Sequence, residues 1–488
     1  MTPTRLTALD ASFLAAETPT AHMHVGWAAV FDPPEGGPRP TFEDLRDHIE
    51  SRLDRTPRYR QRLANVPLGV HDPVWVDDDR FDVDRHVLPT PFTNLDNVIA
   101  AAMSAPVERT RPLWEIWVAP RLDDGRIAVV GKVHHCMVDG LAAVELAALL
   151  LDPAPEAPPA EPDEWRPQPG PGPWSRLARG VVDRVVEEAS LMRLPARIVS
   201  SPSRLAQAVD EGRRVLLSLA SSFGSPAEPS RALNPDISSL RHLGRLHRPI
   251  ADLARIKSRF GTTLNDVVLA VCAGGMRAFL EGRGDERPPG LKVMVPAATR
   301  DSGAAAELGN GISFLFMDLP VDDPDPVRRL RSINRSSRER KANEESRGGA
   351  TVLSALGYAP HLVQRAMTRL VSSPRTFNLV VSNIPGPREP LWMLGCPLRE
   401  AYPVVPLAEQ HALSIGVTSI GDGLNFGLYA DRKTLPDVGR LAGCIDAAID
   451  ELLAQCDRPD PEPEPSHNGR ERDLSSVPAE PLGAAPIG

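Results

Sequence analysis

The sequence predicts an α/β fold with two domains, and three observations support this prediction. With 488 residues, the chain is long enough for two or three domains that each bury a sizeable core. Helical and strand patterns occur together on both sides of a Pro-rich linker. A hydrophobic content of 42% and a charged content of 24% are typical of globular proteins and exclude a wholly disordered or collagen-like chain.

The N-terminal domain is predicted to span residues 1–151. Residues 41–55 predict a helix, because Thr41 suits the N-cap, acidic residues follow in the first turn and apolar residues recur at helical spacing. Val-, Ile- and Trp-rich segments predict strands at 70–76, 114–120 and 126–133. The Asp-Asp-Gly run at 123–125 suits a tight hairpin turn between the last two strands. Residues 140–151 predict a buried helix.

Residues 152–234 are predicted to connect the two domains. Their first part, 153–173, is too rich in proline for packed secondary structure. The next part, 174–223, predicts a helical region broken at Pro195 and Pro202, with eight arginines against five acidic residues. Two interpretations stay open for this Arg-rich segment: a solvated linker, or an amphipathic helix that docks on anionic lipid.

The C-terminal domain is predicted over residues 235–456. Apolar residues at helical spacing indicate helices at 250–259 and 265–280. Strands are predicted at 291–295, 313–319, 377–382, 412–420 and 424–429. From residue 457 the chain is rich in Pro, Glu and Ser, which predicts a disordered tail.

Charge, cysteine content and hydropathy exclude several classes of protein. The 55 basic and 64 acidic side chains give a net charge of −9, which argues against a nucleic-acid binder. The five cysteines are dispersed without a CxxC pair, which predicts reduced thiols in a cytoplasmic protein and no zinc site. No secretory signal and no run of about 20 apolar residues is present, so we expect contact with a membrane only from its surface.

The most specific chemical signal is His134-His135 followed by Asp139 and Gly140, where a predicted strand gives way to a predicted helix. Adjacent strand residues point to opposite faces, so only one of the two histidines can face a given cleft. A neutral imidazole is suited to remove a proton from an alcohol or thiol, which makes His135 the candidate general base. Asp139 and Gly140 fit a turn that needs a local carboxylate and an unhindered backbone.

Residues 134–140 (HHCMVDG) match HHxxxDG, the signature of acyl-CoA-dependent acyltransferases with a chloramphenicol-acetyltransferase-like fold. Further segments resemble one branch of that superfamily, the bacterial wax ester synthase/diacylglycerol acyltransferase family. In the family's order, they are residues 9–14, 23–26, 112–115, 264–268, 296–300, 309–310 and 382–387. The resemblance covers nearly the whole chain apart from the connecting region and the tail.

The resemblance implies two domains of similar topology, each with a mixed sheet flanked by helices, and an active-site tunnel at their interface. His135, in a catalytic motif shared with His134, would deprotonate the acceptor hydroxyl, which attacks the thioester of acyl-CoA without an acyl-enzyme. Asp139 would be structural and hold the histidine loop through an arginine, with Arg300 as a candidate partner. The family's PLW motif would shape the loop and the acyl pocket; here it is Pro112, Leu113 and Trp114.

Two further positions of the family's motifs carry open alternatives. Asn265 is a candidate donor to the oxyanion of the tetrahedral intermediate or a residue that orients substrate; alternatively it is a helix N-cap. Asp266 suits the first turn of that helix and is a candidate substrate-binding residue. Cys136 lies beside the presumed base, but we expect it to be a small buried hydrophobe rather than a nucleophile.

The function implied by the resemblance is transfer of a long-chain acyl group from acyl-CoA to diacylglycerol, with fatty alcohols as further acceptors that give wax esters. Acyl-CoA would be a co-substrate, and no metal or bound cofactor is expected. The enzyme would associate peripherally with the inner membrane face or with lipid droplets. Two alternatives stay open: a same-fold acyltransferase for another hydroxyl or amine acceptor, or a catalytically idle lipid-droplet binding protein.

Overall fold

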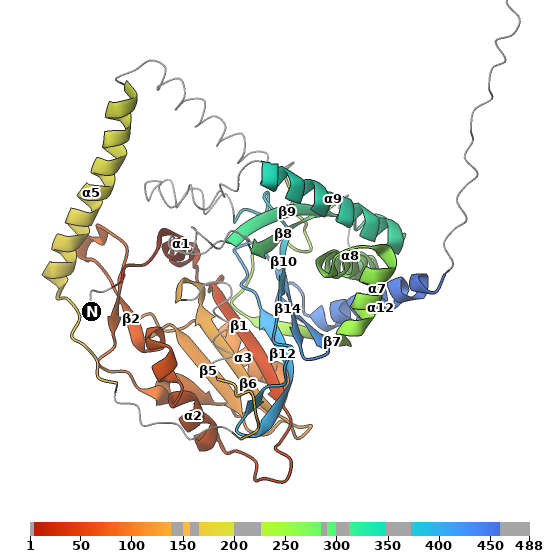
Figure 1. The fold of residues 1–488 in the computed structure, drawn as a ribbon, viewed down its shortest axis with the longest axis horizontal. Coiled ribbons are helices and arrows are strands. Elements are labelled where there is room, and N and C mark those ends of the chain that lie inside the picture. Colours follow the sequence, from red (N-terminus) through yellow and green to blue (C-terminus); the bar gives the residue numbers. More distant parts are fainter. Residues whose placement is uncertain are drawn as a thin grey trace, which may run out of the picture.

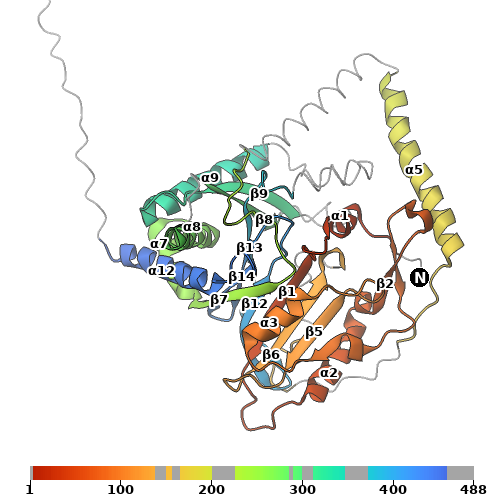
Figure 2. The same cartoon turned by 180° about the vertical axis from the view of Figure 1, so that it is seen from behind.

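The computed structural model describes residues 4–137, 150–156, 165–199, 226–284, 290–298, 312–346 and 372–458. The described residues form two six-stranded sheets and one two-stranded sheet, with helices packed against them (Figures 1 and 2). Both large sheets are mixed, since each contains parallel and antiparallel pairs. This confirms the predicted two-domain α/β architecture with mixed sheets flanked by helices.

The first sheet has the strand order β11-β12-β1-β6-β5-β4, and its one parallel pair is β4 with β5. Its strands are β1 His24–Phe31, β4 Val87–Pro89, β5 Trp114–Ala119, β6 Ile127–His134, β11 Trp392–Met393 and β12 Cys396–Val404. The predicted hairpin between β5 and β6 is confirmed, because Gly125 takes a positive φ of 83° in the turn. In the antiparallel pair of β1 and β6, His24 lies opposite His134.

In the described part of this domain, helices and several short 3-10 turns surround the sheet. The helices are α1 Ala8–Ala16, α2 Phe42–Glu50 and α3 Leu95–Ser104, and the turns include η3 Pro67–Gly69 and η5 His135–Met137. Thr41 begins α2 as predicted, and its side chain forms a capping box with Asp44. The predicted strand at 70–76 is β3 Val74–Asp77, which pairs with β2 Gln61–Ala64. The predicted helix at 140–151 lies mainly outside the described residues.

The second sheet has the order β7-β14-β13-β10-β8-β9, in which β10 is parallel to both of its neighbours. Its strands are β7 Arg241–Pro249, β8 Leu291–Ala298, β9 Ile312–Leu319, β10 Leu379–Ile384, β13 Leu413–Ile420 and β14 Gly423–Asp431. Among the described residues, one face of it is covered by helices (Figure 1), namely α7 Ile250–Phe260, α8 Leu264–Arg283, α9 Pro326–Ser346 and α12 Val438–Cys456. Every helix and strand predicted in this half is present.

Strands β11 and β12 leave the C-terminal half of the chain and join the edge of the first sheet. The predicted range 235–456 assigned them to the second domain, so the sheets do not follow that boundary. The crossing requires close backbone approach: a Cβ on Gly427 would lie 2.2 Å from the carbonyl oxygen of Pro403. A glycine at this position lets β12 pass across β14.

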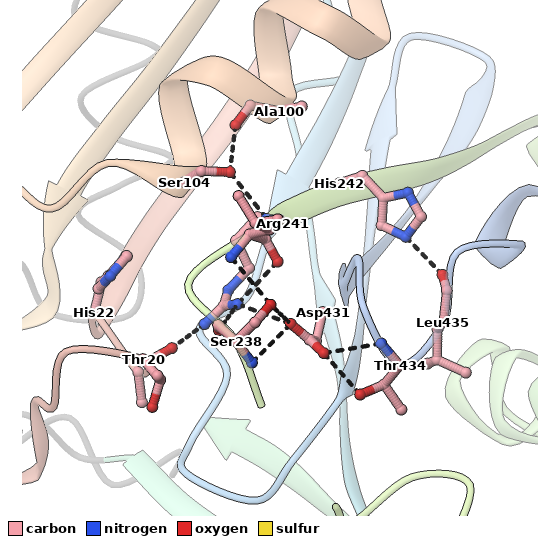
Figure 3. Close-up of polar contacts among 12 residues, drawn as sticks. Thr20, His22, Ala100, Ser104, Ser238, Arg241, His242, Asp431, Thr434 and Leu435 are labelled. Atoms are coloured by element: carbon pink, nitrogen blue, oxygen red, sulfur yellow. Dashed lines mark hydrogen bonds and ion pairs between the residues drawn. The ribbon is translucent and has the colours of Figure 1, made fainter. Parts of the chain in front are cut away.

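Among the described residues, a hydrophobic cluster and the hydrogen bonds of the buried Arg241 connect the two halves. The cluster runs from β1 and α3 across the interface to α8 and α12. Arg241, the first residue of β7, is only 1% exposed, and its guanidinium lies 3.5 Å from the buried Asp431 carboxylate (Figure 3). The same guanidinium donates to the Thr20 carbonyl, and the Arg241 backbone N–H donates to Ser104 Oγ at 2.9 Å. Arg241 therefore joins the second sheet to a loop and to the end of α3 in the first domain.

The Arg-rich segment begins with one long helix, α5 Pro173–Val199, at the periphery of the molecule (Figures 1 and 2). It continues through Pro195, where a break was expected; a proline removes one helical hydrogen bond, which need not end the helix. Residues 200–225 and the tail from 459 lie outside the described residues. No single helix in the described ranges is long and apolar enough to cross a membrane, although α7 and α8 pass that test together with a 103° bend.

Candidate functional site

The histidine pair stands at the junction of β6 and η5, where two other motifs meet it. The His134 backbone N–H donates to the Leu113 carbonyl, and the His135 backbone N–H donates to the Met23 carbonyl, each at 2.9 Å. Leu113 belongs to the PLW motif, and Met23 belongs to the N-terminal motif at 23–26. Segments that are distant in the sequence therefore fix the backbone of both histidines.

His135 is a partly exposed residue, and its ring stacks on Phe13 of α1 with the ring centroids 3.6 Å apart. Its Nδ1 atom is buried and has no hydrogen-bond partner among the described residues. Burial lowers the pKa of His135 to about 4. The ring is therefore uncharged at neutral pH, the state in which an imidazole can accept a proton.

The His134 ring is fully buried and bridges a backbone amide and an acidic residue. Its Nδ1 accepts a hydrogen bond from the Cys136 N–H at 3.1 Å, and its Nε2 lies 3.5 Å from Glu17 Oε2. Glu17 also accepts a hydrogen bond from Arg109. Burial raises the pKa of the Glu17 carboxyl, but its contacts with His134 and Arg109 outweigh burial and lower that pKa below its usual value. The carboxylate is therefore ionised beside His134.

Glu17 and Arg109 were not predicted from the sequence. Glu17 lies 92 positions before Arg109, and neither belongs to a spacing pattern typical of an active site. The available signal in the sequence was that Glu17 lies shortly after the motif at residues 9–14.

Two further buried histidines line the same region but are engaged in packing. His24 Nε2 accepts from the Val107 N–H at 3.3 Å, and His22 Nε2 donates to the Pro19 carbonyl at 3.1 Å. Burial lowers the pKa of both rings. Within the described residues, no group of three or more His, Cys, Asp or Glu side chains is placed to hold a metal ion.

The residues of the PLW motif are buried and support the histidine loop. Trp114 begins β5; its indole N–H donates to the Tyr59 carbonyl at 2.7 Å and its ring stacks on His86. Leu113 is fully buried and offers its carbonyl to His134, and the Pro112 carbonyl accepts from the Trp114 N–H. These contacts agree with the expected role in shaping the loop, while a share in the acyl pocket stays a prediction.

Asn265 and Asp266 lie in the first turn of α8, in the second domain. The N-cap of this helix is Thr263, so the N-cap alternative for Asn265 is wrong, and its role toward an oxyanion or substrate stays a prediction. Asp266 is buried and completes a capping box with Thr263, and it also accepts from Asn334 Nδ2 at 2.7 Å. Through these contacts Asp266 stabilises the start of α8, and its contact with substrate stays a prediction.

Asp139, Gly140 and Arg300 lie outside the described residues, so the proposed pairing of Asp139 stays a prediction. Cys136 is buried, and burial raises the pKa of its thiol well above the usual value. A thiol held in its protonated form agrees with a packing role and not with a nucleophile.

Comparisons with known proteins assign this chain to a family. The wax ester synthase/diacylglycerol acyltransferase catalytic domain matches residues 6–268, and the C-terminal domain of the same family matches residues 308–453. The probable diacylglycerol O-acyltransferase tgs1 of Mycobacterium tuberculosis is 33% identical over 467 residues, which cover 92% of this chain and 96% of that protein. The putative diacylglycerol O-acyltransferase Rv1760 of the same species is 31% identical over 483 residues, covering 94% and 91% of the two chains.

Solved structures agree with this assignment. The wax ester synthase/diacylglycerol acyltransferase from Marinobacter aquaeolei VT8 superposes with a TM-score of 0.67 at 25% identity, covering 93% of this chain and 99% of that one. The trichothecene 15-O-acetyltransferase TRI3 from Fusarium sporotrichioides gives a TM-score of 0.58 at 13% identity, with coverage of 92% and 94%. The latter similarity shows the fold alone.

Proposed function

Since this chain belongs to the wax ester synthase/diacylglycerol acyltransferase family, we propose that it transfers a long-chain acyl group from acyl-CoA to diacylglycerol and forms triacylglycerol. The observation that carries the proposal is the uncharged His135 ring in the HHxxxDG motif, which stacks on Phe13 while the His135 backbone N–H donates to the Met23 carbonyl. The names of the mycobacterial relatives support the acceptor class. Acyl-CoA is the co-substrate, with no metal and no bound cofactor.

In the proposed mechanism His135 is the general base. Its unprotonated ring nitrogen takes the proton of the acceptor hydroxyl while the hydroxyl oxygen attacks the thioester carbonyl carbon. The carbon–sulfur bond of the tetrahedral intermediate then breaks, and the CoA thiolate leaves with the proton from the imidazolium. Asn265 is the proposed donor to the oxyanion, which would stabilise the intermediate from the second domain across the predicted tunnel.

We expect purified protein to release CoA from palmitoyl-CoA only when an acceptor is present, and faster with diacylglycerol than with hexadecanol. The measurement is the rate of thiol release, with triacylglycerol and wax ester identified as products. A faster reaction with hexadecanol would reassign the physiological acceptor to fatty alcohols. Absence of acceptor-dependent release would contradict the proposal and favour another acceptor or a catalytically idle lipid-binding protein.

We further propose that α5 docks the enzyme peripherally on a lipid surface. The helix exposes a stripe of apolar side chains, which we call the α5 stripe: Trp174, Val181, Val182, Val185 and Val186. Leu68 of η3, beside α5, is 90% exposed. Exposed apolar side chains gathered on one helix face are unusual for a surface in water and typical of an interfacial helix.

The opposite face of α5 binds the first domain, which leaves the α5 stripe free. Gly180 packs so closely that a Cβ would lie 2.9 Å from Val66. Arg176 and Arg184 donate to backbone carbonyls, and Asp183 pairs with Arg5. Because these arginines are engaged, we expect lipid binding to depend on apolar burial and only weakly on salt.

We expect the combined variant Trp174→Ser, Val182→Ser and Val185→Ser to lose most of its binding to vesicles of phosphatidylcholine and phosphatidylglycerol, measured by flotation. Each removed side chain withdraws apolar area from the lipid at roughly 25 cal/mol per Å². Phe92→Ser, which removes an exposed aromatic side chain elsewhere in the first domain, is the matched control and should bind as the wild type does. Equal flotation of both variants would contradict docking through α5.

A further inference from the structure

We propose that Glu17 is a positioning residue for the catalytic histidine pair, acting on the His134 ring and through it on His135. The inference rests on the proposed function, in which His135 is the base. Glu17 is the C-cap of α1, and its backbone N–H donates to the Phe13 carbonyl at 3.2 Å. The same helix places the Phe13 ring on His135 and the Glu17 carboxylate beside His134. One short helix therefore contacts both rings.

The contacts of His134 define which of its nitrogens carries the proton. Nδ1 accepts from the Cys136 N–H at 3.1 Å, so the proton of the neutral ring is on Nε2. Nε2 faces Glu17 Oε2 at 3.5 Å, and the negative carboxylate attracts the N–H dipole. The other tautomer would set a ring N–H against the Cys136 N–H and leave an unprotonated nitrogen facing a carboxylate. Glu17 therefore favours the tautomer that binds the Cys136 amide.

Arg109 keeps the carboxylate in place and charged. Its guanidinium donates to Glu17 Oε2 and also to the Leu14 carbonyl at 3.4 Å, so it is bound to α1 at two points. The Glu17 side chain is largely buried, whereas Arg109 is half exposed. A buried carboxylate with a cation on one side and an imidazole N–H on the other is held in one orientation.

The Cys136 amide matters because it lies directly after His135. The amide before it, that of His135 itself, donates to the Met23 carbonyl. With both amides bound, the backbone of His135 has one orientation, and Phe13 then fixes the plane of its ring. Loss of the Glu17 charge would free the His134 ring to change tautomer or rotate, and would release the Cys136 amide. Misplacement of a catalytic group by about 1 Å costs on the order of 10²-fold in rate.

The first test is Glu17→Gln, which keeps the shape of the side chain and removes its charge. We expect kcat for acceptor-dependent CoA release to fall about tenfold to a hundredfold, while the KM for palmitoyl-CoA stays near the wild-type value. Arg109→Gln keeps the Glu17 carboxylate but removes the guanidinium that binds it, and should lower kcat by a smaller factor. Glu108→Gln is the control, because its carboxylate lies in the same loop and pairs with Arg111. Wild-type kcat in Glu17→Gln would overturn the proposal.

A double-mutant cycle with His134→Asn separates positioning from a general effect on the fold. If Glu17 acts through His134, the double variant loses no more activity than His134→Asn alone. Losses that multiply would overturn the proposal, since they would mean that Glu17 acts by another route.

The tautomer of His134 supplies a readout that needs no activity. In protein labelled with ¹⁵N-histidine, the His134 ring signals are those missing from His134→Asn. We expect them to report the Nε2–H tautomer in the wild type and a mixed or altered state in Glu17→Gln. Unchanged ring signals would overturn the role of Glu17, whereas a wild type without acceptor-dependent CoA release would overturn the proposed function instead.

Discussion

Replacing His135 with alanine is expected to lower kcat for acceptor-dependent CoA release by about 10²- to 10⁴-fold, the usual contribution of a positioned general base. The KM for acyl-CoA should change little, because the imidazole acts on the acceptor proton and not on CoA. His135→Gln is the second variant, since it keeps a planar polar side chain over Phe13 but cannot take the proton. Both variants should lose activity alike.

The control for this experiment is His247→Ala. His247 is an exposed residue of β7 in the second sheet. Its ring forms a hydrogen bond with the Asn425 side chain of β14, and so takes no part in the contacts of the histidine pair. We expect close to wild-type activity in this variant. Full activity in His135→Ala would exclude the proposed mechanism, and product analysis would then have to identify another base.

The pH profile of the wild type gives an independent view of the same base. A solvated histidine loses its basic form as the pH falls through about 6.5. Burial places the pKa of His135 at about 4, so the unprotonated form persists well below neutral pH. We therefore expect kcat/KM to stay level from about pH 7 to pH 5 and to fall only near the lowered pKa, in short assays started by a pH jump. An acid limb centred near 6.5 would show that the working base is a solvated imidazole.

The elements that the sequence predicted well are those defined by neighbouring residues. Helix α2 was predicted from Thr41 and the acidic first turn, and the β5–β6 hairpin from Gly125 and its flanking strands. The path of β12 could not be predicted, because its pairing with β1 joins residues more than 350 positions apart. Nothing in the local sequence of β12 specifies which sheet it enters.

The candidate site shows the same division. His134 and His135 belong to one contiguous motif and were identified directly, whereas Glu17 and Arg109 reach them from separate loops. Thr263 could have been found, since it precedes Asp266 by three residues, as Thr41 precedes Asp44. The structure shows the same capping box at the start of α2 and of α8, which explains why Asn265 is not the cap of α8.

Loss of the ion pair between Arg241 and Asp431 is expected to lower the stability of the protein strongly. Both side chains are buried, and the Asp431 carboxylate also accepts hydrogen bonds from Ser238 and Thr434 (Figure 3). Burial raises the pKa of Asp431, but these hydrogen bonds outweigh burial and lower it, so the carboxylate is ionised. Removal of Asp431 would leave the Arg241 guanidinium buried without its counter-charge at the interface of the two domains.

We expect Asp431→Ala to lower the free energy of unfolding by about 3–5 kcal/mol, the usual cost of an unpaired buried charge, measured by urea denaturation. Asp32→Ala is the control: it breaks an exposed pair between Asp32, which directly follows β1, and Arg399 of β12, and should cost about 1 kcal/mol or less. Adding Arg241→Met to Asp431→Ala should restore part of the loss, because no buried charge then lacks a partner. Equal costs for the two single variants would mean that the protein tolerates an unpaired guanidinium at this position, and that the buried ion pair adds no more to stability than the exposed one.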